Sequence, residues 1–277
     1  MSDRDQYPAG VPCFVDTLVP DVEVAKRFYG AVFGWEFTGP GAMPDDPPGE
    51  YFVARLRGRD VAAVGTRPAD GADGADGEGP SSGWNTYVAV SSADDAAAQA
   101  LALGGAVLVE PFDAPPAGRM AVIADPSGAT LCVWEAGVRH GAQSVNEPSA
   151  WAMSALNTPD PERAREFYGE LFGWRAESFD AGPGMELWLW RLPDYVGGEP
   201  QQPVPRDVVA AMSRSSESPA SWSVDFWISD ADAAAAAPSQ FGGRVIAPPF
   251  DEAGFRRTVL ADPHGAVFSA SQLQVPA

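Results

Sequence analysis

The sequence repeats itself. Residues 21–35 read DVEVAKRFYGAVFGW, and residues 160–174 read DPERAREFYGELFGW. Two further blocks return in the same order: GGAVLVEPFD as GGRVIAPPFD, and ADPSGA as ADPHGA. A chance likeness between two amphipathic helices would not repeat turns and strands as well, so the pattern indicates an internal duplication. A length of 277 residues fits two domains.

The duplication predicts the domain boundaries. We expect a first domain over 11–137, a linker over 138–149 and a second domain over 150–275. The stretch between the copies is polar, aperiodic and contains Gly, as is typical of a linker.

Each copy begins with a strand followed by a helix. Residues 11–19 are rich in β-branched and aromatic side chains, which favours a strand. The helix that follows is predicted to start at the N-cap Asp21 and to end at Gly34, a residue that tolerates the left-handed conformation. Asp160 and Gly173 have the same roles in the second copy.

Shorter strands and an Ala-rich helix complete each copy. Expected strands are 36–37, 51–56, 61–64, 84–90, 107–109, 120–124 and 130–134 in the first copy, with a helix over 93–103. In the second copy they include 176–179, 185–192 and a doubtful edge strand near Val208. The order predicts an α+β fold of four βαβββ modules. Two modules side by side would form a curved, mostly antiparallel eight-stranded sheet, with helices on the convex face and an open cleft for a small molecule on the other.

Two segments fall outside this plan. Residues 66–83 are low in complexity and acidic, and residues 196–220 contain Gly, Pro, Ser and Gln. We expect mobile loops there, with a lid over the cleft as the alternative.

Composition limits the partners. The chain has 18 basic and 38 acidic residues, a formal charge of −20, which argues against nucleic-acid binding. It has no apolar run long enough to span a membrane, and residues 1–10 do not resemble a secretory signal. Two cysteines, Cys13 and Cys132, make no disulfide framework. We expect an acidic cytoplasmic protein that binds a small molecule, as a monomer or a loose homodimer.

The blocks RFYGAVFGW and EFYGELFGW, with ADPSGA and ADPHGA about 90 residues after them, resemble the vicinal oxygen chelate superfamily. That superfamily includes glyoxalase I, extradiol dioxygenases and bleomycin-resistance proteins. The resemblance covers both copies and is greatest to the tandem two-domain actinobacterial type. It implies the fold strongly and the chemistry weakly, since one scaffold hosts many reactions.

The resemblance implies one divalent metal in the cleft, held by His, Gln or Glu at defined strand positions. In this sequence those positions carry Phe14 and Met153 on the first strand of each copy, Asn85 and Ser223 on the fifth, and Cys132 and Ser269 on the last, while the fourth ligand position has only Glu186 to offer.

These side chains depart from the family's pattern. Phe donates no lone pair, and a Met thioether suits soft metals. The only histidines are His140 in the linker and His264 in the Asp-Pro turn. We therefore expect no metal and no cofactor. Asp16, Asn85 and Cys132 could lie close enough together to hold a metal, because Asp16 shares a strand face with Phe14. We favour the alternative that Asp16 is a polar group that orients a ligand.

Aromatic residues are numerous on the strands expected to line the clefts. Strand alternation turns about half of them toward the helices, where they would be core. The remainder could stack on a flat ligand. Trp188 and Trp190 share one face of a strand and form a plausible stacking wall, with Leu187 and Leu189 on the opposite face. Phe14, Trp84 and Trp222 are the other aromatic candidates.

Two arginines occupy matching places, six residues before each Asp-Pro turn. Arg119 and Arg256 could hold a carboxylate or phenolate, or could form salt bridges in so acidic a protein. Cys132 could be a nucleophile, but no His stands near enough in the pattern to activate it, which favours an inert thiol.

Three functions remain open. The favoured one is a metal-free protein that binds a small aromatic or amphipathic metabolite, as bleomycin-binding relatives do. The second is a lyase, isomerase or oxygenase of the glyoxalase type, with unknown catalytic residues. The third is a partner-binding scaffold.

Overall fold

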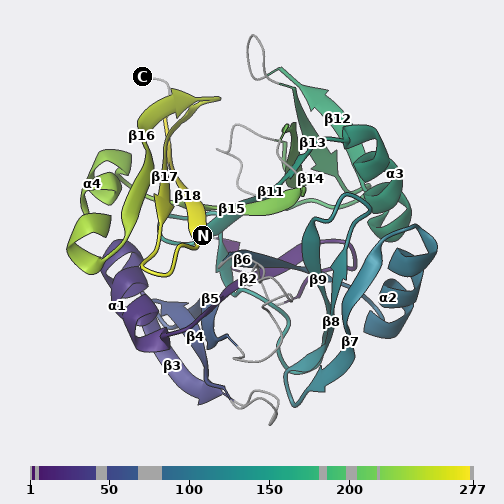
Figure 1. The fold of residues 1–277 in the computed structure, drawn as a ribbon, viewed down its shortest axis with the longest axis horizontal. Coiled ribbons are helices and arrows are strands. Elements are labelled where there is room, and N and C mark those ends of the chain that lie inside the picture. Colours follow the sequence, from purple (N-terminus) through teal and green to yellow (C-terminus); the bar gives the residue numbers. More distant parts are fainter. Residues whose placement is uncertain are drawn as a thin grey trace.

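Each copy of the repeat forms one eight-stranded sheet (Figure 1). The computed structural model describes residues 2–3, 6–41, 49–67, 83–180, 186–197, 205–216 and 219–274. The first sheet has the order β3-β4-β5-β2-β6-β9-β8-β7, and the second has the corresponding order β12-β13-β14-β11-β15-β18-β17-β16. In both, two modules of four strands join through one central antiparallel pair, so the α+β fold of four modules is confirmed.

The strands of the first sheet match the expected ones closely but are longer at several ends. They are β2 (Pro12–Val19), β3 (Glu36–Gly41), β4 (Tyr51–Leu56), β5 (Arg59–Thr66), β6 (Trp84–Ala89), β7 (Ala106–Ala114), β8 (Gly118–Ala124) and β9 (Thr130–Ala136). A short pair, β1 (Ser2–Asp3) with β10 (Ser144–Val145), forms a separate two-stranded sheet that contacts β5 and β11.

The second sheet contains one strand, β14, that the sequence indicated only weakly. Its strands are β11 (Trp151–Thr158), β12 (Arg175–Phe179), β13 (Leu187–Arg191), β14 (Val208–Arg214), β15 (Ser221–Trp227), β16 (Arg244–Glu252), β17 (Phe255–Ala261) and β18 (Val267–Leu273). The prediction of a doubtful edge within a mobile 196–220 loop was wrong for β14, which lies inside the sheet between β13 and β11. Pro and Gln precede this seven-residue strand, and Ser and Pro follow it, so its surroundings are typical of a loop.

The helices begin and end where the sequence places caps. They are α1 (Val22–Phe33), α2 (Ala93–Ala102), α3 (Pro161–Phe172), α4 (Ala231–Ala236) and the short 3-10 helix η1 (Pro238–Phe241). Asp21 accepts a hydrogen bond from the backbone N of Val24 at 3.0 Å, and Gly34 ends α1 with φ of 72°. Asp160 and Gly173 do the same for α3.

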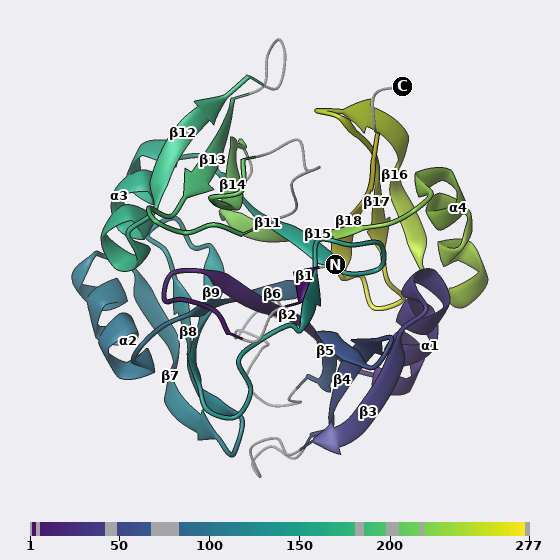
Figure 2. The ribbon, with the colours of Figure 1, turned by 180° about the vertical axis from the view of Figure 1, so that it is seen from behind.

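The two curved sheets meet at their central strands, and their concave faces point away from each other (Figure 1). Central strands β6 and β15 are in contact, and Thr86 Oγ1 on β6 lies 2.7 Å from Ser154 Oγ on β11. Each flank carries helices from both copies: α1 contacts η1, and α2 contacts α3, as the rear view also shows (Figure 2). Both hydrophobic clusters therefore contain residues of both copies.

Paired tyrosines and aspartates lock this arrangement. Tyr29 on α1 donates to Asp262 in the second copy's turn, and Tyr168 on α3 donates to Asp125 in the first copy's turn, each at 3.0 Å. All four side chains are buried. The two repeated motifs thus meet each other across the copies.

Within the described ranges, none of the helices has the length and apolar character needed to cross a bilayer. Most of the 66–83 segment, and residues 198–204 and 217–218 of the other segment, lie outside the described residues. The mobile loops expected there, and the alternative of a lid, fall on those residues.

Candidate functional site

The open face of the second sheet contains a cavity of about 480 Å³. This volume falls within the range of small-molecule sites, which is roughly 300–1,000 Å³. Both modules of the sheet contribute to it. Its apolar lining includes Met153, Phe179, Leu187, Leu189, Trp227 and Phe255.

The apolar wall on β13 is made of leucines. Leu187 and Leu189 line the cavity, whereas Trp188 and Trp190 occupy the other face of the strand. Trp190 is fully buried, with its ring centroid 5.9 Å from that of Tyr168 under α3. The expected stacking wall of Trp188 and Trp190 is therefore corrected. The two tryptophans do share one face of the strand, as strand alternation predicts, but that face packs in the core. The leucines on the opposite face line the cavity.

The other two candidate tryptophans also lie in the shared core. Trp222 donates through Nε1 to the Tyr168 hydroxyl at 3.0 Å. Trp84 packs edge-on against Tyr29, with ring centroids 5.3 Å apart. Neither is among the residues that line the cavity.

A hydrogen-bonded row of amide and hydroxyl groups crosses the middle of the cavity. Ser213 Oγ donates to Asn157 Oδ1 at 2.8 Å, and Asn157 Nδ2 donates to Ser223 Oγ at 3.2 Å. The three residues come from β14, β11 and β15, which are neighbouring strands. The row fixes the orientation of the Asn157 amide.

The fourth module adds charged groups on its side of the cavity. Asp225 on β15 accepts from Ser271 Oγ at 2.8 Å, and Arg257 on β17 donates to Glu252 at 2.7 Å. Burial raises the pKa of Asp225, and the nearby Arg257 charge and the Ser271 hydrogen bond oppose this rise.

Sequence reasoning found part of this set. Of the candidates, Met153, Glu186, Ser223 and Ser269 line the cavity. Glu186 is paired with Arg214 there. Asp225 and Arg257 were missed, although Asp225 shares a strand face with Ser223 by simple alternation.

The matching position in the first sheet is filled by its own side chains. Asp16 accepts hydrogen bonds from the hydroxyls of Tyr51 and Tyr87 at 2.8 and 2.7 Å, and from Asn85 Nδ2 at 2.8 Å. Only 1% of Asp16 is exposed. Its carboxylate is thus engaged by protein donors, whereas we expected it to orient a ligand.

Phe14 and Cys132 lie in the same filled region and are buried. Burial raises the pKa of the Cys132 thiol well above its usual value, and the neighbouring Asp16 charge raises it further. A thiol in this environment is a poor nucleophile.

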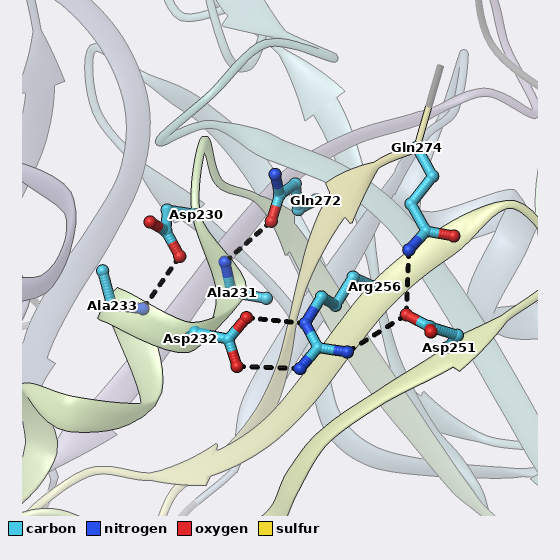
Figure 3. Close-up of polar contacts among 8 residues, drawn as sticks. All are labelled: Asp230, Ala231, Asp232, Ala233, Asp251, Arg256, Gln272 and Gln274. Carbon is cyan, nitrogen blue, oxygen red and sulfur yellow. Dashed lines mark hydrogen bonds and ion pairs between the residues drawn. The ribbon is translucent and has the colours of Figure 1, made fainter. Parts of the chain in front are cut away.

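Arg119 and Arg256 lie away from the cavity and form salt bridges. The three guanidinium nitrogens of Arg256 are all engaged, two by Asp232 on α4 and one by Asp251 on β16 (Figure 3). Arg119 repeats the arrangement with Asp94 and Asp113. Both arginines therefore form the salt bridges that the sequence left open as one of two possibilities, and each guanidinium nitrogen already has a carboxylate partner.

The residues present do not fit the divalent metal that the resemblance implies. Within the described part of the chain, no three His, Cys, Asp or Glu side chains are grouped closely enough to hold an ion. Asn85 points its amide donor at Asp16, and His264 contacts the backbone O of Asp21 at 3.1 Å, on the flank between the copies. Most side chains at the expected ligand positions thus differ from the His, Asp, Glu and Cys ligands that zinc and iron sites use.

Comparisons with known proteins agree with this architecture. The family model described as a glyoxalase-like domain matches residues 13–134 and again 153–271. The chain is 36% identical over 276 residues to "Putative glyoxylase CFP32" of Mycobacterium bovis, covering 97% of each chain. It is 32% identical over 275 residues to "Anthracycline biosynthesis protein DauV" of Streptomyces sp. (strain C5), covering 97% of this chain and 95% of the relative.

Solved structures share the fold at low identity. The Mn(II)-bound glyoxalase from Novosphingobium aromaticivorans has a TM-score of 0.60 at 17% identity, covering 99% of this chain and 84% of that one. The 2,3-dioxygenase LapB from Pseudomonas sp. KL28 has a TM-score of 0.62 at 16% identity, covering 97% and 95%. With two matches to the family model and relatives similar along nearly the whole length, this chain belongs to the glyoxalase-like family.

Proposed function

We propose that this protein binds a small amphipathic, partly aromatic molecule in the cavity of the second sheet, and that it does so without a metal. The observation that carries the proposal is the cavity of about 480 Å³, with leucines along one side and oriented hydrogen-bonding groups across its middle. Such a lining favours a ligand with an apolar body and a few polar substituents.

The contrast between the copies supports one ligand per chain. At corresponding positions the first sheet has Asp16, Tyr51 and Tyr87, which bond to one another, whereas the second has Ala155, Leu187 and Asp225 around the cavity. A relative named for anthracycline biosynthesis is consistent with an aromatic ligand.

The test uses 1-anilinonaphthalene-8-sulfonate, a dye whose emission rises in apolar sites. We expect saturable binding at one site per chain. Ala211→Leu, which fills the cavity floor, should abolish the saturable signal. Arg256→Gln, on the outer surface, should leave it unchanged and is the matched control.

Metal independence is tested in the same assay. Binding should survive EDTA and dialysis, and added Zn²⁺, Mn²⁺ or Fe²⁺ should not strengthen it. The proposal is wrong if a folded Ala211→Leu variant binds like the wild type, or if chelation removes binding.

A further inference from the structure

The leucine wall and the Asp225 and Arg257 groups come from different modules around the cavity of the second domain. The third module (β11 to β14) supplies Leu187, Leu189 and Ala211, while the fourth module (β15 to β18) supplies Asp225 and Arg257. The third module also supplies the Glu186–Arg214 pair, and the fourth also supplies Trp227 and Phe255. A molecule that fills this space can therefore contact the leucines and the Asp225 and Arg257 groups at the same time.

The charged side forms a row across adjacent strands. Asp225 lies on β15, Ser271 on β18 and Arg257 on β17, and Ser271 and Arg257 are direct cross-strand partners. Ser271 donates to Asp225 Oδ1. Asp225 is the partner of Ser269, so Asp225 and Arg257 lie two strands apart and are offset by two residues along β18. Among the described residues they make no direct ion pair, and Arg257 pairs with Glu252 instead.

Arg257 keeps unused donors. Its Nη1 is bound to Glu252, while its Nε is buried and has no acceptor within the described residues. The neighbouring Arg256, on the other face of the same strand, has all three nitrogens engaged (Figure 3). A buried guanidinium N–H without an acceptor is costly, so it is expected to find one when a ligand binds.

The first copy lacks this row. Register places Met120 where the second copy has Arg257, and Tyr87 where it has Asp225. The charged groups are thus a property of one cavity and not a requirement of the fold.

Resting on the proposed function, we infer that the ligand is a hydroxylated aromatic acid or quinone-like compound bound in one direction, with its hydroxyl donating to Asp225 and its anionic or carbonyl oxygen accepting from Arg257. Its apolar body then lies against Leu187 and Leu189. The two charged residues act as specificity determinants of the cavity.

The experiment separates the two contacts with three probes. Isothermal titration calorimetry measures the binding of 2-naphthoate, 2-naphthol and 6-hydroxy-2-naphthoate. Arg257→Met, which copies the first domain's side chain, should weaken both carboxylates about tenfold and leave 2-naphthol within about twofold. Asp225→Asn should weaken 2-naphthol and should strengthen 2-naphthoate, because it removes a repelling charge.

Controls keep the outcomes distinct. Arg256→Gln should bind all three probes like the wild type, and Arg257→Gln replaces Arg257→Met if the latter unfolds. If wild type binds the probes but the variants show no opposite preference, the inference is overturned while the proposed function stands. If no probe and no anilinonaphthalene dye binds wild type, both are overturned.

Discussion

The hydroxyl of Tyr29 lies 3.0 Å from the carboxylate of Asp262, although 233 residues separate them in the chain. Tyr168 and Asp125 repeat the contact on the opposite flank at the same distance. In both turns the aspartate's other oxygen accepts two backbone N–H groups, so each carboxylate is satisfied only when the other copy's helix is in place.

Removing one of these hydroxyls should weaken the whole molecule. Tyr29→Phe leaves a buried carboxylate short of a donor, and the free energy of unfolding should fall by about 1–3 kcal/mol. Tyr168→Phe should give a similar loss. Urea denaturation followed by fluorescence and by circular dichroism measures it. A loss in one transition only, with the other copy unaffected, would contradict the shared core.

The closed network of the first sheet predicts a stability effect without a binding effect. Asp16→Ala leaves two tyrosine hydroxyls and one amide without their acceptor, which should cost at least about 3 kcal/mol. Asp16→Asn keeps an acceptor and should cost less. Folded samples of both should bind the anilinonaphthalene dye as the wild type does. Weaker binding by Asp16→Asn at full folding would place the ligand in the first copy.

The pKa of Asp225 makes stability depend on pH with a definite sign. Burial raises this pKa above the unfolded value of about 3.9, so between the two values the native state holds more protons. Stability from this group falls as pH rises through that window and stays low above it. Asp225→Asn should therefore raise the melting temperature at pH 7, and the gain should shrink toward pH 4. An unchanged gain across the range would show that the raised pKa is not the cause.

Trp227 should report on the cavity. It lines the hollow, whereas Trp190 is enclosed in the core. A non-fluorescent aromatic quencher that binds there should reduce the emission of the wild type, and Trp227→Phe should remove most of that reduction. Trp188→Phe is the control and should keep it. Equal quenching in wild type and Trp227→Phe would refute the assignment.

Much of the fold could be predicted from local signals. Asp21 and Gly34 mark the ends of α1, because a cap acts within one turn of the helix. The repeat places Asp160 and Gly173 at the same positions, so the ends of α3 could be predicted in the same way. The pairing of strand modules followed from the repeat order. Strand β14 escaped because a short strand flanked by polar residues has little local signature.

The residues of the site were harder to predict than the fold. The alternation of side chains along a strand identifies two faces but does not tell which of them lines a cavity. Trp188 and Leu187 are equally good candidates until the core beneath α3 is known to need the larger ring. Arg256 and Arg257 pose the same problem one residue apart: the first is saturated by Asp232 and Asp251, while the second turns toward the cavity. Only tertiary packing distinguishes them.

The contacts between helices of the two halves have a consequence for how the chain can be divided. A polypeptide severed between residues 137 and 150 would give two fragments, each with an apolar flank uncovered and a carboxylate awaiting a hydroxyl that the other fragment carries. Neither piece would be a self-sufficient unit, and recovery of the native form would depend on their reassociation.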